Sequence, residues 1–359
     1  MKAIEVVAFG GPEVLRIVER ADPTPGPGEV LIRVEAVGLN WSDLLQRAGA
    51  YPGGPTPPFI AGQEAAGIVV AHGAGVVAST SGSSMSGSSM SGSSMSSSSM
   101  SGSSGSSMSG SSGSSRSGSS SGAVVAPPVG ARVCAIGPRL GAELAVVPAS
   151  MCFAWDASAE QRAALPISLL TAYAALAPWA GRIPTTKAAG APDTVLVHAA
   201  AGALGHIATQ VGRKLGMRVI GTASGGKRQF VDADVVCGYD ELRVAAPDGV
   251  DIVLDGVGGQ VFRDSLAVLK PRGVIVVVGA SSGEPQLIDP QKLVMRSHTV
   301  AGLHLRHLLA NPDELARTID ACRALDVTAR VTSMPMADIA NAHARLQGRE
   351  IAGKLVLTW

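Results

Sequence analysis

The residues whose types and spacing suggest chemistry lie in a turn at 195–210, which reads VLVHAAAGALGHIATQ. An apolar run ends in small residues, and a helix-like pattern then begins. The turn matches G-x-G-x-x-G with Ala200 in place of the first glycine, followed by Gly202 and Gly205. Gly202 would let the backbone approach a pyrophosphate, and Gly205 would let the helix pack closely on the strand. We therefore expect a dinucleotide at the helix N-terminus; the alternative is a tight turn that binds no ligand.

The residues after the next strand indicate which dinucleotide this is. An NAD site typically carries Asp or Glu there, to hold the ribose 2′-hydroxyl. Here the strand runs into Ser224, Lys227 and Arg228, and no carboxylate appears before Asp232. A hydroxyl and two cations suit a 2′-phosphate, so we expect NADPH as the cofactor. The alternative is that Lys227 and Arg228 are the solvated start of a short helix.

Short apolar runs surround these motifs and indicate how they are positioned. The runs are nearly continuous, as strands buried on both faces require, and helix-like stretches lie between them. They cover residues 194–199, 218–223, 251–256 and 274–279. This rhythm predicts a doubly wound parallel sheet of the Rossmann type.

The N-terminal part has a different pattern. Residues 29–39 alternate apolar and polar side chains as a half-buried strand does, and 64–73 resemble a more fully buried strand. Gly and Pro separate such runs, which predicts a β-rich unit. Further along, 158–180 read as helical, with Ser158 as N-cap and Gln161 at the N3 position.

A low-complexity tract occupies residues 79–122. It consists almost wholly of Ser, Gly and Met, with one charge at Arg116. Such a composition has almost nothing to bury, so we expect a disordered insertion. Its flanks would join as strand, turn and strand, which places the insertion on a surface turn.

Composition and charge exclude several classes of protein. The chain is 46% hydrophobic and 16% charged with a net charge of +1, which predicts binding neither to nucleic acid nor to an anionic membrane. It contains no apolar run of membrane-spanning length, and its first residues are too mixed for a secretory signal. We therefore expect a cytoplasmic protein. The four cysteines are scattered and suggest neither a disulfide framework nor a zinc ribbon.

Several segments together resemble the medium-chain dehydrogenase/reductase superfamily, and within it the zinc-free quinone oxidoreductase and enoyl reductase branch. They are GPEVLRIVE, PGPGEVLIRVEAVGLNWSDLLQRAGAYP, GQEAAGIV, AAGALG, LPISLLTAYAAL, LDGVGG, LKPRGVIVVVGASSG and IAGKLVLTW. The resemblance covers nearly all the chain except the Ser/Gly tract. It implies an α/β fold in which a GroES-like, β-rich catalytic domain of residues 1–162 plus 300–359 packs on a Rossmann domain of 163–299.

The resemblance also implies a site without metal. Asn40 and Gln63 stand where zinc-dependent relatives carry a ligand Cys and a ligand His, and neither amide replaces those ligands. Asn40, Asp43 and Tyr51 would line the substrate end of the site, with Tyr51 protonating a developing oxyanion and Gln63 donating an amide N–H. Alternatively, Asp43 only caps a helix and Tyr51 is a half-buried turn residue.

The cofactor contacts that the resemblance implies come from six parts of the chain. They are Thr171, Ala201, Gly202, Ala203, Leu204, Gly205, Ser224, Lys227, Arg228, Gly256, Val257, Gly279, Ala280, Ser281 and Lys354. Thr171 fits helix packing equally well. His198, by its place at the end of a strand, is expected to be structural. His206, His304 and His343 occur singly, which favours core or surface positions over catalysis.

Two departures from the family pattern bear on the cofactor. The helix after Arg228 is about two turns shorter than usual, which loosens one face of the adenosine pocket, and residues 181–193 form a longer linker. The implied activity is hydride transfer to a quinone or an activated C=C bond of an enone or enoyl ester. Rival readings are an NADPH-binding sensor without turnover and a trans-acting polyketide enoyl reductase. Residues 295–305 resemble the pairing strand of dimeric relatives, so a homodimer is expected.

Overall fold

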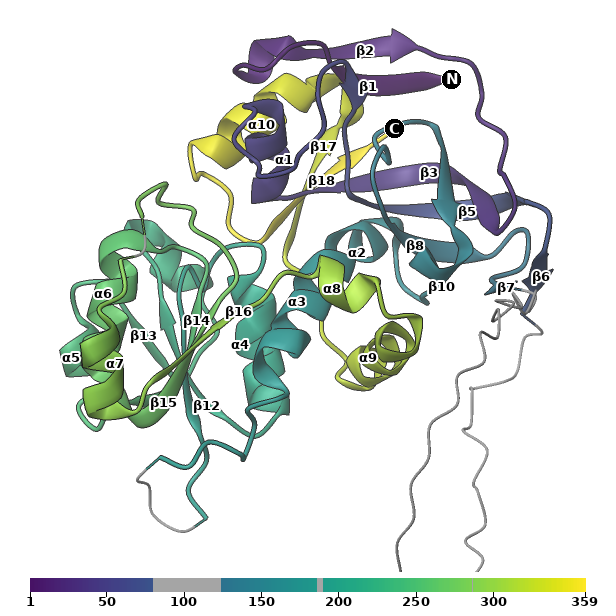
Figure 1. The fold of residues 1–359 in the computed structure, drawn as a ribbon. Helices are drawn as coiled ribbons and strands as arrows, with labels where there is room; N and C mark the ends of the chain where they lie inside the picture. Colours follow the sequence, from purple (N-terminus) through teal and green to yellow (C-terminus); the bar gives the residue numbers. More distant parts are fainter. Residues whose placement is uncertain (80–123, 186–189, 286) are drawn as a thin grey trace, which may run out of the picture.

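The computed structural model describes residues 1–79, 124–185, 190–285 and 287–359 (Figure 1). The expectation of a disordered insertion falls almost entirely outside the described residues. On either side of it, β6 (Val76–Ala78) and β7 (Val124–Ala126) pair in parallel. The flanks are strands, as expected, but their parallel pairing is not that of a simple hairpin.

Two sheets organise the N-terminal and C-terminal parts of the chain. The larger has the strand order β10-β8-β5-β3-β18-β17, with β9 also paired to β3. Its members are β3 (Glu29–Leu39), β5 (Glu64–His72), β8 (Arg132–Ile136), β9 (Leu144–Pro148), β10 (Cys152–Ala154), β17 (Val331–Pro335) and β18 (Lys354–Thr358). A smaller sheet contains β1 (Lys2–Val6), β2 (Leu15–Glu19) and β4 (Phe59–Ile60). The last strand of the chain thus lies directly beside β3.

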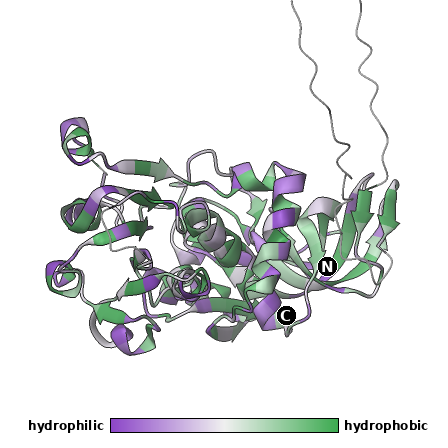
Figure 2. Cartoon of the chain, turned by 90° about the horizontal axis from the view of Figure 1, so that it is seen from below, coloured by the Kyte–Doolittle hydropathy of each residue, from purple (hydrophilic) through white to green (hydrophobic). Residues whose placement is uncertain are grey.

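The second large sheet is the parallel one that the apolar runs predict. Its order is β13-β12-β11-β14-β15-β16, so the strand order reverses beside β11. The strands are β11 (Thr194–Val197), β12 (Arg218–Thr222), β13 (Val235–Cys237), β14 (Val250–Asp255), β15 (Leu269–Val277) and β16 (Thr299–Gly302). The central strands β11 and β14 are buried along their whole length, which explains why their sequences are mostly apolar, although β14 also contains the buried Asp251 and Asp255. In Figure 2 the strands are coloured mainly as hydrophobic, whereas the helices carry mixed faces. β16 extends the sheet beyond residue 299.

Helices cover both faces of the parallel sheet and link the two parts of the molecule (Figure 1). The α-helices are α1 (Trp41–Arg47), α2 (Ala159–Ala164), α3 (Pro166–Leu176), α4 (Gly205–Lys214), α5 (Leu242–Ala245), α6 (Gly259–Val268), α7 (Pro290–Arg296), α8 (Arg306–Leu309), α9 (Pro312–Ala324) and α10 (Ile339–Gln347). Short 3₁₀ helices are η1 (Pro12–Val14), η2 (Ala149–Met151), η3 (Gly225–Phe230) and η4 (Met336–Asp338). Among the described residues, no helix combines the length and apolar character needed to cross a membrane.

The helical stretch at 158–180 is two helices rather than one. Ser158 caps α2 by accepting the N–H of Gln161 at 3.3 Å, as expected from the sequence. Pro166 lacks an N–H and opens α3 at its first position, which separates the two helices. Between β12 and β13 the structure has only η3, so the expected shortening of this helix is confirmed.

Candidate active site

The glycine turn follows β11 at the carboxyl edge of the parallel sheet. Its left-handed residue is Ala199, with φ of +49°, which directly precedes Ala200, the residue in place of the first glycine of the motif. Ala200 is fully buried and donates its N–H to Thr222 at 2.8 Å. A Cβ on Gly205 would overlap the carbonyl oxygen of Ala199, whereas a Cβ on Gly202 would lie 3.2 Å from it. Gly205 is therefore required for close packing of α4 on the strand, as the sequence predicts.

The start of α4 offers a cradle for an anion. Among the described residues, the backbone N–H groups of Ala203, Leu204 and Gly205 have no hydrogen-bond acceptor. Such groups at the positive end of a helix bind phosphate oxygens. His206 holds this turn in place, because Nδ1 lies 2.8 Å from the carbonyl of Gly202 and Nε2 accepts the N–H of Arg330 at 3.1 Å. Burial lowers the pKa of His206 to about 4, which keeps the ring neutral. The turn therefore fits the pyrophosphate of a dinucleotide.

Beyond β12, the two expected cations point in different directions. Lys227 Nζ donates to the carbonyl of Ile351 at 2.7 Å, and burial and the charge of Arg349 lower the pKa of Lys227. Arg228 instead forms an exposed ion pair of 3.1 Å with Glu241. Lys227 therefore contacts the C-terminal segment that leads to β18. Arg228 instead faces away from this segment, towards Glu241.

Arg349 is a cation that the sequence patterns did not reveal. It has a left-handed backbone, with φ of +56°, and donates to the carbonyl of Ser281 at 2.9 Å. Its guanidinium lies 5.5 Å from the centre of the Trp41 ring. Arg349 therefore connects the loop after β15 with the start of α1. Only its position in the segment leading to the last strand could have suggested this role.

Beneath the glycine turn, polar side chains are packed against one another. His198 is buried between Thr222, at 3.0 Å, and Ser265, at 2.7 Å, and burial lowers its pKa to about 3. Tyr239 stacks on the His198 ring with centroids 5.9 Å apart. Burial raises the pKa of Tyr239, and Thr222 and the backbone of Ala199 oppose this shift. These contacts give His198 the supporting position that we expected of it.

The remaining expected cofactor residues lie in loops at the same edge. Ser281 donates its N–H to Gly256 at 3.0 Å, so the loops after β14 and β15 are joined. Val257 N–H is bound at 2.7 Å by the carboxylate of the buried Asp255. These loops contain Gly256, Val257, Gly279, Ala280 and Ser281. Ser224 lies at the N-cap position of η3 without a side-chain capping hydrogen bond, and Thr171 is half-buried on α3.

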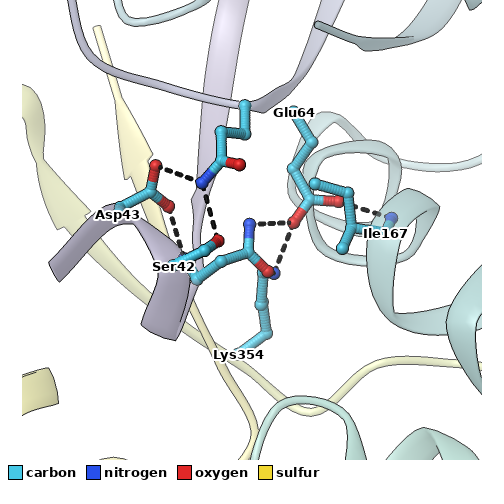
Figure 3. A network of polar contacts seen from close by, with 7 residues as sticks. Ser42, Asp43, Glu64, Ile167 and Lys354 are labelled. Atoms are coloured by element: carbon cyan, nitrogen blue, oxygen red, sulfur yellow. Dashed lines mark hydrogen bonds and ion pairs between the residues drawn. The ribbon is translucent and has the colours of Figure 1, made fainter. Parts of the chain in front are cut away.

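A buried ion pair lies beside this edge (Figure 3). Lys354 and Glu64 are fully buried and pair directly, and Lys354 Nζ also donates to Asn40 Oδ1 at 2.6 Å. Glu64 accepts the amide of Asn40 at 2.8 Å and the N–H of Ile167, in the first turn of α3, at 2.8 Å. Lys354 therefore positions Asn40, and its buried ammonium is directed into this network. Glu64 was missed in the sequence, although it follows Gln63 directly.

Asp43 and Gln63 form the other half of the network. Asp43 accepts the backbone N–H of Asn40 at 2.7 Å, which caps α1, and the side-chain amide of Gln63 at 2.9 Å. Gln63 also donates to Ser42 at 2.7 Å. Burial raises the pKa of Asp43 to about 6. The structure thus supports the capping interpretation of Asp43 and also places it beside Gln63.

The side chains at this position do not suit a zinc ion. Asn40 and Gln63 offer amides, and the carboxylate of Glu64 is already bound by the ammonium of Lys354. The described part of the chain contains no group of three His, Cys, Asp or Glu side chains that could hold a metal. The donor set therefore differs from the thiolate and imidazole set that a catalytic zinc prefers.

Tyr51 contacts His304, one of the three histidines that occur singly in the sequence and that we did not expect to be catalytic. Tyr51 Oη lies 3.1 Å from His304 Nε2, and both side chains are accessible. His304 follows β16, so the contact joins the β-rich sheet to the edge of the parallel sheet.

Comparison with known proteins identifies the family. The family described as "Alcohol dehydrogenase GroES-like domain" matches residues 26–156, and that described as "Zinc-binding dehydrogenase" matches 231–357. The fold is similar to a mycobacterial protein complexed with NADPH, with 32% identity, a TM-score of 0.76 and complete coverage of both chains. It is also similar to an Escherichia coli quinone oxidoreductase complexed with NADPH, with 26% identity, a TM-score of 0.77 and complete coverage of both chains.

Curated relatives agree with this. The chain is 27% identical to a rat synaptic vesicle membrane protein VAT-1 homolog, over 99% of this chain and 84% of the relative. It is 28% identical to a 2-haloacrylate reductase from Burkholderia, over 97% of this chain and 96% of the relative. The chain belongs to the medium-chain dehydrogenase/reductase superfamily, in its quinone oxidoreductase and VAT-1-like branch.

Proposed function

We propose that this protein is an NADPH-dependent, zinc-independent oxidoreductase that reduces a quinone or an activated C=C bond, as in an enone or enoyl ester. NADPH, when bound, supplies the hydride. Relatives named above were solved with NADPH, and one is named as the reductase of a 2-haloacrylate, whose double bond is conjugated. Such acceptors are already electrophilic, so a protein need only orient them and stabilise the oxygen that becomes negative.

The main support for the proposal is that two consecutive residues, Gly353 and Lys354, connect the glycine turn to the polar network around Asn40. Gly353 donates its N–H to Ala201 of the glycine turn at 2.8 Å, and the next residue, Lys354, holds Asn40 at 2.6 Å. The anion cradle and the polar network are therefore adjacent, as hydride transfer between a dinucleotide and a substrate requires.

Each polar residue has a definite task in this proposal. The free N–H groups before α4 bind the pyrophosphate, and Lys227 and Arg349 face the 2′-phosphate. Asn40, held by Lys354 and Glu64, orients the acceptor carbonyl or the nicotinamide ribose. Tyr51 gives its proton to the developing enolate or quinol oxygen.

Titration with NADPH and, separately, NADH tests the proposal, with nicotinamide fluorescence as the signal. We expect NADPH-selective binding, followed by NADPH oxidation with at least one acceptor in a panel of quinones and enones. Selective binding without oxidation of any acceptor would favour a nucleotide-binding sensor. Absence of binding would overturn the enzyme assignment.

A homodimer is part of the proposal. β16 forms one edge of the parallel sheet, and its residues are half-buried or exposed. Pairing of two copies along this strand would satisfy the unpaired backbone groups of both edges. Light scattering should give twice the mass of the chain, and a monomer would contradict this expectation.

A further inference from the structure

The pair of Tyr51 and His304 comes from distant parts of the chain. Tyr51 follows α1, and His304 lies 253 positions later, just after β16. Besides the 3.1 Å contact between Oη and Nε2, the rings meet edge to face with centroids 6.4 Å apart. His304 is therefore within hydrogen-bond distance of the Tyr51 hydroxyl, which is the proton donor in the proposed function.

The second ring nitrogen determines which way the hydrogen bond runs. His304 Nδ1 accepts the backbone N–H of Arg306 at 3.2 Å. A nitrogen that accepts carries no proton in the neutral ring, so the proton is on Nε2. Nε2–H then donates to Tyr51 Oη, which leaves the phenol's own proton directed elsewhere.

The ionisable groups around His304 favour the neutral ring. Tyr51 faces it from the loop after α1, and Arg306 and His307 face it from α8, with the two histidine rings 6.3 Å apart. Burial, Arg306 and His307 all lower the pKa of His304. Near neutral pH the ring therefore keeps the single proton on Nε2.

We propose that His304 is a positioning residue that stabilises the phenolate formed when Tyr51 transfers its proton. This inference rests on the proposed function. The hydride, with its electron pair, adds to the acceptor, and the O–H bond of Tyr51 breaks as a new O–H bond forms on the oxygen that has become negative, which belongs to an enolate or to the monoanion of a quinol. The charge left on Tyr51 Oη is met by the N–H of His304, and water then returns the proton to the phenolate. A hydrogen bond to a charged oxygen is about twice as strong as one to a neutral oxygen, so the contact strengthens during the step.

Three variants test this role. His304→Leu removes the N–H, His304→Gln can place an amide N–H at similar reach, and His307→Leu alters the neighbouring ring, which does not touch Tyr51. We expect His304→Leu to lower kcat about 10-fold, as loss of a charge-assisted hydrogen bond does. His304→Gln should recover most of that loss, and His307→Leu should retain wild-type kcat. The alkaline limb of the kcat profile should move to higher pH in His304→Leu, because the phenolate forms less readily.

A measurement on the protein without substrate complements the kinetics. The phenolate absorbance of Tyr51 is obtained as the difference between each protein and its Tyr51→Phe counterpart during a pH titration. We expect this band to appear at higher pH in His304→Leu than in the wild type. An unchanged band together with wild-type kcat would overturn the inference.

The outcomes separate this inference from the proposed function. If Tyr51→Phe keeps wild-type kcat, the role of Tyr51 is wrong, and that of His304 with it. If Tyr51→Phe is slow but His304→Leu is not, only the role of His304 is wrong. If His304→Leu is slow without a shift of the alkaline limb and without recovery in His304→Gln, the contact is a structural link between the two sheets, and the inference is overturned.

Discussion

Lys354 Nζ reaches Asn40 Oδ1 at 2.6 Å from a fully buried position on the last strand. The two residues meet because β18 pairs antiparallel with β3, which ends at Leu39 immediately before Asn40. In the proposed function, Lys354 acts on the cofactor or substrate through Asn40. The same ammonium pairs with Glu64, so one cation both compensates a buried carboxylate and holds Asn40 in place.

Lys354→Met tests the contribution of this ion pair to stability. The substitution leaves the carboxylate of Glu64 buried without its cation, which typically costs about 3–5 kcal/mol. Urea denaturation should show this loss in the free energy of unfolding. The double variant Lys354→Met/Glu64→Gln, which has no buried charge, should recover much of it. If the double variant is as unstable as the single one, uncompensated charge is not the cause.

Gly202→Ala and Gly205→Ala separate cofactor binding from folding. A Cβ on Gly202 would lie 3.2 Å from the carbonyl oxygen of Ala199, in the turn that leads into the anion cradle, whereas a Cβ on Gly205 would overlap that oxygen. We expect Gly202→Ala to weaken NADPH binding about 10-fold with little change in stability. Gly205→Ala should also lower the free energy of unfolding, by about 1–3 kcal/mol, as overpacking does. Equal NADPH affinity of Gly202→Ala and the wild type would place the pyrophosphate elsewhere.

Lys227→Met and Arg228→Met distinguish the two neighbouring cations. Lys227 lies beside Arg349 and Ile351 at the proposed 2′-phosphate position, whereas Arg228 is paired with Glu241 at the surface. Loss of one hydrogen bond to a charged group corresponds to about 10-fold to 100-fold in affinity. Lys227→Met should therefore weaken NADPH binding by this factor and leave NADH binding unchanged. Arg228→Met is the matched control, and a comparable loss in it would contradict the assignment.

The buried His198 predicts a pH dependence of stability. Burial lowers its pKa from 6.5 to about 3, so the unfolded chain binds a proton that the folded protein does not. The associated stability is complete above pH 6.5 and is lost as the pH falls towards 3, by at most about 1.4 kcal/mol per pH unit. Urea denaturation between pH 6.5 and 5 should give a shallower slope for His198→Gln than for the wild type. Identical slopes would mean that His198 does not contribute to acid destabilisation.

Local sequence was sufficient for several elements of the fold. Nearly continuous apolar runs mark β11 and β14 because both faces of these strands are buried. Ser158 marks the start of α2 because its hydroxyl accepts a backbone N–H that has no partner within the helix. The glycine turn could also be predicted from the sequence, because a glycine is required at position 205 for the helix to pack this closely on the strand. These features depend on neighbours only a few positions away.

Tertiary structure alone decided which side chains meet. Glu64 and Lys354 are 290 positions apart, and Tyr51 and His304 are 253 apart, so no local pattern relates them. Their contacts follow from the pairing of β18 with β3 and from the packing of the loop after β16 against the loop after α1. A side chain such as Lys227 has many rotamers, and its partner is determined by the segment that packs against it. The sequence thus determined the scaffold and the cofactor turn, and the packing of distant strands determined the polar partners within the site.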